Sequence, residues 1–204
     1  MKVLKEVCVE SFLEALEAEK KGADRIELCD NLSFGGTTQS YGTIKKTLEK
    51  IKIPVFPIIR PRGGDFFYTQ DEIEIMKEDV RICKFLGAKG IVIGMLTKDK
   101  KIDFKLVKEF VSLAHPMEVT FHKAIDEVEN PVEMIDGLIN AGVKRILSSG
   151  TKKTALEGAD ILNKMIEKAK DKIIIVVAGK VTAENFSEIS EKIISSEYHG
   201  KAII

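Results

Sequence analysis

Three stretches of the chain repeat one arrangement: GADRIEL at residues 22–28, GAKGIVI at 87–93 and GVKRILS at 142–148. Each begins with a glycine and a small apolar residue, continues through a charge, and ends in an aliphatic run. A glycine in this position is typical of the left-handed residue that ends a helix, and the aliphatic run is typical of a strand. A repeated helix-to-strand junction indicates successive βα units and therefore a parallel sheet.

Runs rich in β-branched residues predict eight strands, with helix-period stretches between most of them. Two of the predicted helices begin with the spacing of a capping box, Ser11 with Glu14 and Thr69 with Glu72. The eight predicted strands are 3–9, 26–29, 55–59, 91–94, 119–122, 146–148, 173–178 and 197–199.

Eight βα units fit a (β/α)8 TIM-type barrel, and an open doubly wound sheet is the alternative. The open sheet usually carries G-x-G-x-x-G after its first strand, and the chain contains neither this motif nor a P-loop, so we favour the barrel. Only GKAII (200–204) follows the last predicted strand, so a complete final helix is not expected. The uncovered apolar flank predicts a homodimer or a higher homo-oligomer, or else a partly open barrel wall. Without a linker-like stretch, residues 1–204 are expected to form a single domain.

The composition narrows the class of partner. Lys plus Arg and Asp plus Glu are 32 each, and a net charge of zero argues against nucleic acid or an anionic membrane as the main partner. No apolar run is long enough for a membrane helix, and the first residues lack an apolar signal core. Three cysteines do not form a disulfide framework. We therefore expect a reduced, cytoplasmic protein.

The first two predicted strands carry the same tripeptide, Glu6-Val7-Cys8 and Glu27-Leu28-Cys29. Residues two apart on a strand share a face, and neighbouring strands lie about 4.8 Å apart. Cys8 and Cys29 would then face each other at the barrel mouth and hold Cu(I), because thiolates favour this soft cation. The alternative is that both cysteines are small core residues. Cys83 lies on the apolar stripe of a predicted helix and is assigned to the core.

A second group of residues at the predicted strand ends indicates an anion site. Arg60 and Arg62 flank a proline and precede two glycines, and Lys123 follows His122 after the fifth predicted strand. These cations could hold a small anionic, even phosphorylated, substrate, with Glu27 or His122 as the acid or base of an enzyme of unknown reaction. A salt-bridged loop is the structural alternative, and a scaffold whose rim charges satisfy one another is a third reading.

Several segments resemble the CutC copper-homeostasis family over nearly the whole chain. They are EVCVES (6–11), GADRIELCDNLSFGGTTQS (22–40), IPVFPIIRPRGGDFFYT (53–69), TFHKAID (120–126) and RILSSG (145–150). The resemblance implies a TIM-type barrel, a cytoplasmic location, and Cu(I) bound by Cys8 and Cys29. It also implies a polar cluster at the mouth, made of Glu6, Glu27, Arg60, Arg62, His122 and His199. Lys123 and Ala178-Gly179-Lys180 depart from the family pattern, which puts a phosphate site at the last two loops in doubt.

Overall fold

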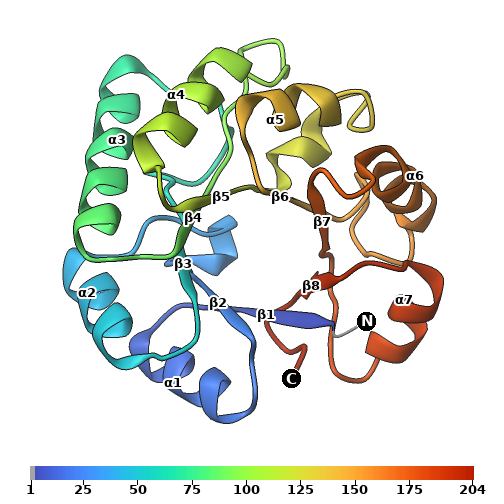
Figure 1. The fold of residues 1–204 in the computed structure, drawn as a ribbon, viewed down its shortest axis with the longest axis horizontal. Coiled ribbons are helices and arrows are strands. Elements are labelled where there is room, and N and C mark those ends of the chain that lie inside the picture. Colours follow the sequence, from blue (N-terminus) through green and yellow to red (C-terminus); the bar gives the residue numbers. More distant parts are fainter. Residues whose placement is uncertain (1–2) are drawn as a thin grey trace.

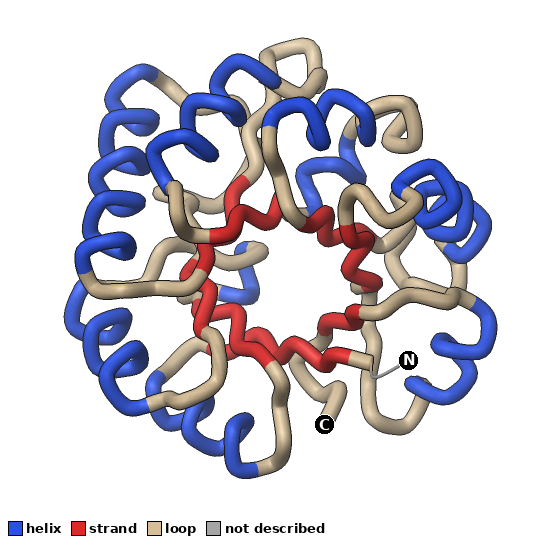
Figure 2. The backbone as a smooth tube through the Cα atoms, in the orientation of Figure 1, coloured by secondary structure: helices blue, strands red, loops and turns tan. Residues whose placement is uncertain are grey.

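The computed structural model describes residues 3–204, in which eight parallel strands curve into a barrel (Figure 1). The first strand, β1, pairs with both β2 and β8, and an isolated bridge between Ile58 and Val92 joins β3 to β4. The strands therefore form a ring, as Figure 2 shows, and the predicted TIM-type barrel is confirmed. The strands are β1 (Leu4–Val9), β2 (Arg25–Leu28), β3 (Val55–Pro57), β4 (Gly90–Ile93), β5 (Glu118–Phe121), β6 (Arg145–Ser148), β7 (Ile174–Val177) and β8 (Glu197–His199).

In the described part of the chain, seven α-helices surround the ring of strands (Figure 2). Two short 3₁₀ helices, η1 (Leu32–Phe34) and η2 (Lys123–Glu127), follow β2 and β5. The α-helices are α1 (Phe12–Lys20), α2 (Tyr41–Lys50), α3 (Gln70–Phe85), α4 (Phe104–Ala114), α5 (Ile135–Ala141), α6 (Ala159–Ala169) and α7 (Phe186–Lys192).

The local signals of the sequence act as predicted at the helix ends. Thr69 and Glu72 form a complete capping box at the start of α3, which satisfies backbone N–H groups of the first turn. Gly22, Gly87 and Gly142 end their helices with φ angles of 95°, 81° and 86°. Residues with side chains rarely adopt this conformation, so the three glycines explain why the junctions repeat.

Within residues 3–204 no helix follows β8, in agreement with the expectation from the sequence. After β8 the described chain continues only as a tail, which pairs with the preceding loop through a bridge between Thr182 and Ala202 and buries Ile203. A groove of about 210 Å³ remains between β1, α1 and this tail. Its lining includes the apolar side chains of Val7, Ala18 and Ile204.

The strands divide the core into two regions because their side chains alternate between faces. Outward-facing residues of the strands pack against the helices in one large apolar cluster, which also contains the fully buried Cys83 of α3. The lumen holds two smaller apolar groups instead. One consists of Cys29, Phe56, Ile58 and Val92, and the other of Leu147, Val176 and Ala178. The rest of the lumen is polar.

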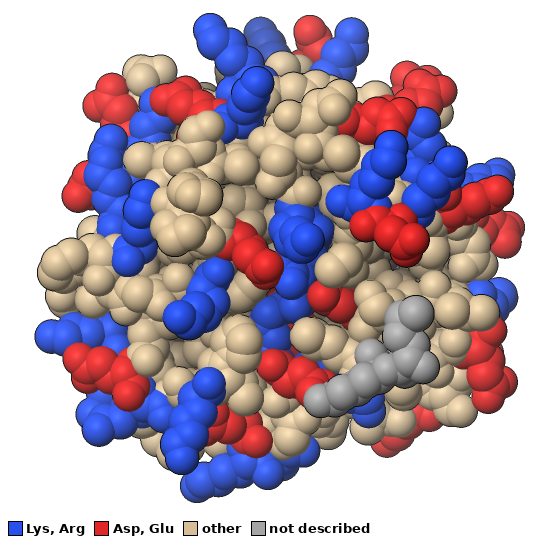
Figure 3. Space-filling view, in the orientation of Figure 1, with Lys and Arg blue, Asp and Glu red and all other residues tan. Residues whose placement is uncertain are grey.

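The described surface offers no segment for crossing a bilayer: none of the helices within residues 3–204 has the required length and apolar character. Figure 3 shows positive and negative side chains interspersed over one face of the molecule. Charges of both signs also lie at the centre of this face, over the ring of strands.

Candidate metal centre

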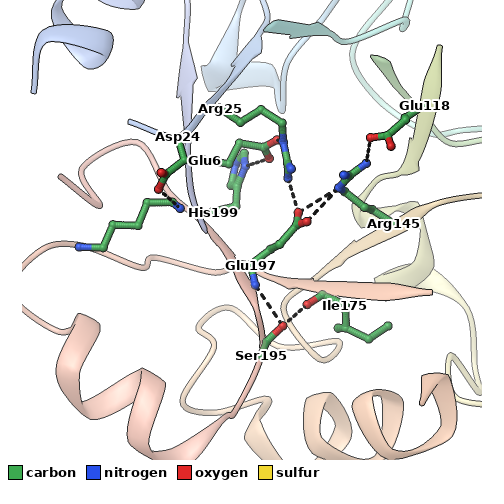
Figure 4. A network of polar contacts seen from close by, with 10 residues as sticks. Glu6, Asp24, Arg25, Glu118, Arg145, Ile175, Ser195, Glu197 and His199 are labelled. Atoms are coloured by element: carbon green, nitrogen blue, oxygen red, sulfur yellow. Dashed lines mark hydrogen bonds and ion pairs between the residues drawn. The ribbon is translucent and has the colours of Figure 1, made fainter. Parts of the chain in front are cut away.

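A network of buried ion pairs occupies part of the lumen (Figure 4). Arg25 donates hydrogen bonds to Glu6 and, at 2.6 Å, to Glu197. Arg145 donates to both oxygens of Glu197, at 3.0 and 3.1 Å, and to Glu118. We define these five residues, from β1, β2, β5, β6 and β8, as the lumen network. Its carboxylates and guanidinium groups compensate one another, which is what buried charges require.

Glu6 connects the lumen network to His199. The Nδ1 atom of His199 lies 2.8 Å from Glu6 Oε1, and its Nε2 atom lies 3.6 Å from Glu27 Oε2. Burial alone would lower the pKa of His199, but the negative charges of Cys8 and Glu27 and hydrogen bonds with Cys8 and Glu6 raise it well above its ordinary value. Burial also opposes ionisation of Glu6, yet Arg25 and His199 together lower the pKa of Glu6 to about 2.

Three potential ligand atoms converge beside this histidine. Cys8 Sγ, a carboxylate oxygen of Glu27 and a ring nitrogen of His199 all lie within 4.8 Å of one another. The strand register produces this arrangement, because β1 pairs Cys8 with Glu27 on one side and Glu6 with His199 on the other. Burial, reinforced by the charge of Glu6, raises the pKa of Glu27 to about 7, although His199 and Arg25 lower it. We call Cys8, Glu27 and His199 the mouth triad.

The donor set suits a soft or borderline metal ion. A thiolate favours Cu(I) or zinc, and an imidazole nitrogen is accepted by either. Nδ1 of His199 forms a hydrogen bond with Glu6, so that Nε2 is directed toward the other two members of the triad. A carboxylate on the far nitrogen is the usual support of a metal-binding histidine. The residues of the triad therefore fit a metal ion.

Cys29 lies outside the mouth triad. Because the register pairs Cys8 with Glu27, Cys29 is displaced by two residues, and the prediction that the two thiols face each other directly is wrong. The strands of a barrel are staggered, and this stagger cannot be read from one strand alone. The Cys29 thiol donates to the carbonyl of Val9 at 3.4 Å. Burial, followed by the charge of Glu27, raises the pKa of Cys29.

The two arginines of the predicted anion site contact neighbouring loops, although the Nε atom of Arg60 is buried without a hydrogen-bond partner within residues 3–204. Arg60 donates to the backbone carbonyls of Phe34, Gly36 and Gly64 and so holds the loops that follow β2 and β3. Arg62 forms ion pairs with Asp65 and Glu72. These contacts correspond to the salt-bridged loop that the sequence left as the alternative. An anion held jointly by Arg60, Arg62 and Lys123 stays a prediction.

A cavity of about 200 Å³ adjoins the mouth triad. We call it the mouth cavity, and its polar lining consists of Glu27, His122, Lys123 and His199. The side chain of His122 is 4% exposed, and burial followed by the charge of Arg60 lowers its pKa to about 3. His122 is therefore neutral at physiological pH.

A family model described as the CutC family matches residues 3–204. The chain belongs to the CutC family. A human relative described as a copper homeostasis protein cutC homolog is 45% identical over 199 residues, which are 98% of this chain and 73% of the relative. The CutC family protein of Chromobacterium violaceum is 39% identical over 97% of this chain and 80% of its own length.

Solved structures agree with this assignment. The CutC structure from Streptococcus agalactiae is 34% identical and superposes with a TM-score of 0.93 over 99% of this chain and 100% of that one. A deoxyribose phosphate aldolase from Aeropyrum pernix has a TM-score of 0.73 over 98% of this chain and 86% of that one, at 12% identity. At this identity the likeness concerns the barrel fold alone.

Several polar residues of this CutC-family barrel were missed by sequence reasoning. Arg25 and Glu197 lie two residues before Glu27 and His199, so the period of a strand could have placed them in the lumen. Asp126 was also missed, although it accepts hydrogen bonds from Ser148, Ser149 and Thr151 and orders the loop after β6. Nothing in the sequence near Asp126 signals this role.

Proposed function

We propose that this member of the CutC family binds Cu(I) at the mouth triad and thereby takes part in copper homeostasis. The convergence of Cys8 Sγ, a His199 nitrogen and a Glu27 oxygen within 4.8 Å carries the proposal. The human and mouse relatives that match 98% of the chain are both described as copper homeostasis proteins. A thiolate ligand also favours a reducing compartment, so we place the protein in the cytoplasm.

Cys8 and His199 are the two ligands of the proposed site. Cu(I) accepts low coordination numbers and prefers sulfur and nitrogen to carboxylate oxygen. Cys8 binds the metal as a thiolate, and binding must displace the proton of the Nε2 atom of His199. Glu27 contributes a nearby negative charge, and Glu6 keeps the imidazole directed toward the metal.

The pairing of Cys8 with Cys29 that the sequence suggests is the competing ligand set. Cys29 lies on the same side of β2 as Glu27 but belongs to an apolar cluster with Phe56 and Ile58. Burial and the charge of Glu27 raise the pKa of Cys29, which makes its thiolate costly to form. Cys8 with His199 is therefore the better-supported pair.

An anaerobic Cu(I) titration against a competing chelator tests the proposal. We expect Cys8→Ser to weaken binding by about a hundredfold or more, and Cys29→Ser by less than about threefold. Cys83→Ser is the matched control, because Cys83 lies in the outer core. Unchanged affinity in Cys8→Ser would contradict the proposal. Equal losses in Cys8→Ser and Cys29→Ser would support the two-thiolate pair instead.

One observation favours a second function, proton transfer to a small substrate. The Glu27 carboxyl lines the mouth cavity, and its pKa of about 7 lets it gain or lose a proton near neutral pH. His122, whose pKa is lowered to about 3, is the weaker candidate for this role. Hydrogen–deuterium exchange at the methyl group of pyruvate, followed by NMR with metal-free protein, tests this function. Acceleration that Glu27→Gln abolishes is expected; no acceleration by the unmodified protein would exclude Glu27 as a base for this probe.

A further inference from the structure

We propose that the mouth cavity binds a short monocarboxylate, held by the imidazole N–H of His122 and the ammonium group of Lys123. Both residues line the cavity. Neither Arg60 nor Arg62 lines the cavity, and the site requires neither copper nor catalysis. It therefore goes beyond the proposed function.

The side chain of His122 is held in a fixed position. A Cβ atom at residue 94 would overlap the His122 ring, so Gly94 provides the space that the imidazole occupies. On another side, the ring of Phe66 lies 4.8 Å away between centroids. The backbone N–H of Ala124 donates to His122 Nδ1 at 3.1 Å. The ring is therefore held by Gly94, by the bond from Ala124 and by Phe66, which also lines the cavity.

The hydrogen bond from Ala124 also determines the tautomer. Because Nδ1 accepts a hydrogen bond from the backbone N–H of Ala124, the hydrogen of the neutral ring must be on Nε2. Nε2 is buried and has no hydrogen-bond partner within residues 3–204. A buried donor without an acceptor costs about 1–3 kcal/mol. A hydrogen bond from Nε2 to an oxygen atom of a bound ligand would remove this cost. We therefore expect the ligand of the cavity to carry a hydrogen-bond acceptor.

Lys123 supplies the charge that selects an anion. Its side chain is 46% exposed, and its Nζ atom lies 4.0 Å from Asp126 Oδ2, at the limit of an ion pair. Asp126 already accepts hydrogen bonds from Ser148, Ser149 and Thr151. Since Asp126 holds Lys123 only weakly, the ammonium group can turn toward a ligand.

Charge and size narrow the class of ligand. One neutral N–H and one ammonium group match the single charge of a carboxylate, whereas a phosphate dianion would need more donors and would lie near Glu27. At about 30 Å³ for each water-sized group, a volume of about 200 Å³ holds roughly six or seven non-hydrogen atoms. Leu32, Ile58, Phe66 and Leu147 provide apolar contacts for a short carbon chain.

Thermal denaturation of metal-free protein with four probes, acetate, propionate, L-lactate and pyruvate, provides the test. At least one of these carboxylates is expected to raise the melting temperature, and its neutral amide and inorganic phosphate should bind at least about tenfold more weakly. The inference is overturned if no carboxylate stabilises the protein, or if the amide or phosphate binds as well as the acid.

Variants and NMR then locate the binding. His122→Phe keeps a ring but removes the N–H, and Lys123→Gln removes the charge; each is expected to weaken carboxylate binding at least about tenfold. Lys98→Gln, at an exposed position, is the matched control and should bind normally. In the unmodified protein, the Nε2–H resonance of His122 should shift on addition of carboxylate. Binding that leaves this resonance unchanged would contradict the proposed site.

The Cu(I) titration separates this inference from the proposed function. His122→Phe and Lys123→Gln should bind Cu(I) with unchanged affinity, because neither residue belongs to the mouth triad. Conversely, Cys8→Ser should retain carboxylate binding, because Cys8 does not line the cavity. Loss of carboxylate binding in Cys8→Ser would place the ligand on the metal centre instead and would overturn the inference.

Discussion

The lumen network and the barrel mouth are both rich in ionisable groups, yet they differ in how those groups are compensated. In the network, Arg25 and Arg145 are paired with Glu6, Glu118 and Glu197. At the mouth, His122 Nε2 has no partner among the described residues, and the Glu27 carboxyl has a pKa of about 7. Compensated charges hold a structure together, whereas uncompensated groups remain available to a ligand or a proton. From this contrast we infer that the lumen network stabilises the fold and that the groups at the mouth bind ligands.

The largest effect should follow from removing the centre of the network. Glu197→Ala leaves two buried guanidinium groups without their shared carboxylate, and we expect a loss of about 3–5 kcal/mol in the free energy of unfolding. Urea denaturation measures it. The exposed Glu191→Ala on α7 should change the same quantity by less than about 0.5 kcal/mol. Similar losses in the free energy of unfolding of both variants would show that the lumen network does not stabilise the fold.

The second effect is a dependence of stability on pH that originates at the mouth. The pKa of His122 is about 3 in the folded protein against an ordinary value of 6.5. Between these values the unfolded chain binds a proton that the folded protein does not. The contribution of His122 is therefore complete above pH 6.5 and is lost as the pH falls toward 3, by up to about 1.4 kcal/mol per pH unit.

His122→Phe isolates this contribution from those of other titrating groups. The free energy of unfolding of the variant, measured by urea denaturation from pH 7 to pH 4, should fall less steeply than that of the unmodified protein. Parallel curves for the two proteins would mean that His122 is not held neutral by its surroundings.

A smaller effect is expected where the network meets the metal centre. Glu6→Gln keeps a hydrogen-bonding group beside His199 Nδ1 but removes the charge that orients the imidazole. We expect Cu(I) affinity to fall by about tenfold, within the range found for residues that support metal ligands. Chelator competition measures it, with circular dichroism to verify folding. An unchanged affinity would separate the network from the metal site.

The smallest effect concerns assembly at the groove between β1, α1 and the tail that follows β8. The sequence predicts a homodimer, and the groove lined by Val7, Ala18 and Ile204 is the surface that we expect a second copy to cover. Light scattering should then give twice the chain mass of 22.7 kDa. Ile204→Asp should favour the monomer with little change in stability. A monomeric unmodified protein would contradict this prediction.

The sequence predicted the barrel well but the metal centre only in part. The repeated glycine junctions and strand runs depend on local conformation, so they identified all eight strands and the missing final helix. The partner of Cys8 depends on the stagger between strands, which local patterns do not encode. Glu27 and Cys29 are both plausible partners from the tripeptide, and only the register selects Glu27.

The same limit explains the arginine loop. Arg60 and Arg62 have the composition of an anion site, and only the structure shows that the Nη atoms of Arg60 bond to carbonyls and that Arg62 pairs with a carboxylate of a neighbouring segment. The sequence likewise places His122 at the end of a strand but does not predict its protonation state or its hydrogen bonds. Its neutrality and its free N–H follow from burial, from Gly94 and from the bond to Ala124, which three-dimensional packing decides.

X-ray absorption at the copper edge of the Cu(I)-loaded protein tests the central claim most directly. The mouth triad predicts one sulfur and one nitrogen neighbour per copper, with the sulfur signal lost in Cys8→Ser and retained in Cys29→Ser. Two sulfur neighbours per copper, or a sulfur signal that survives Cys8→Ser, would contradict the assignment of Cu(I) to Cys8 and His199.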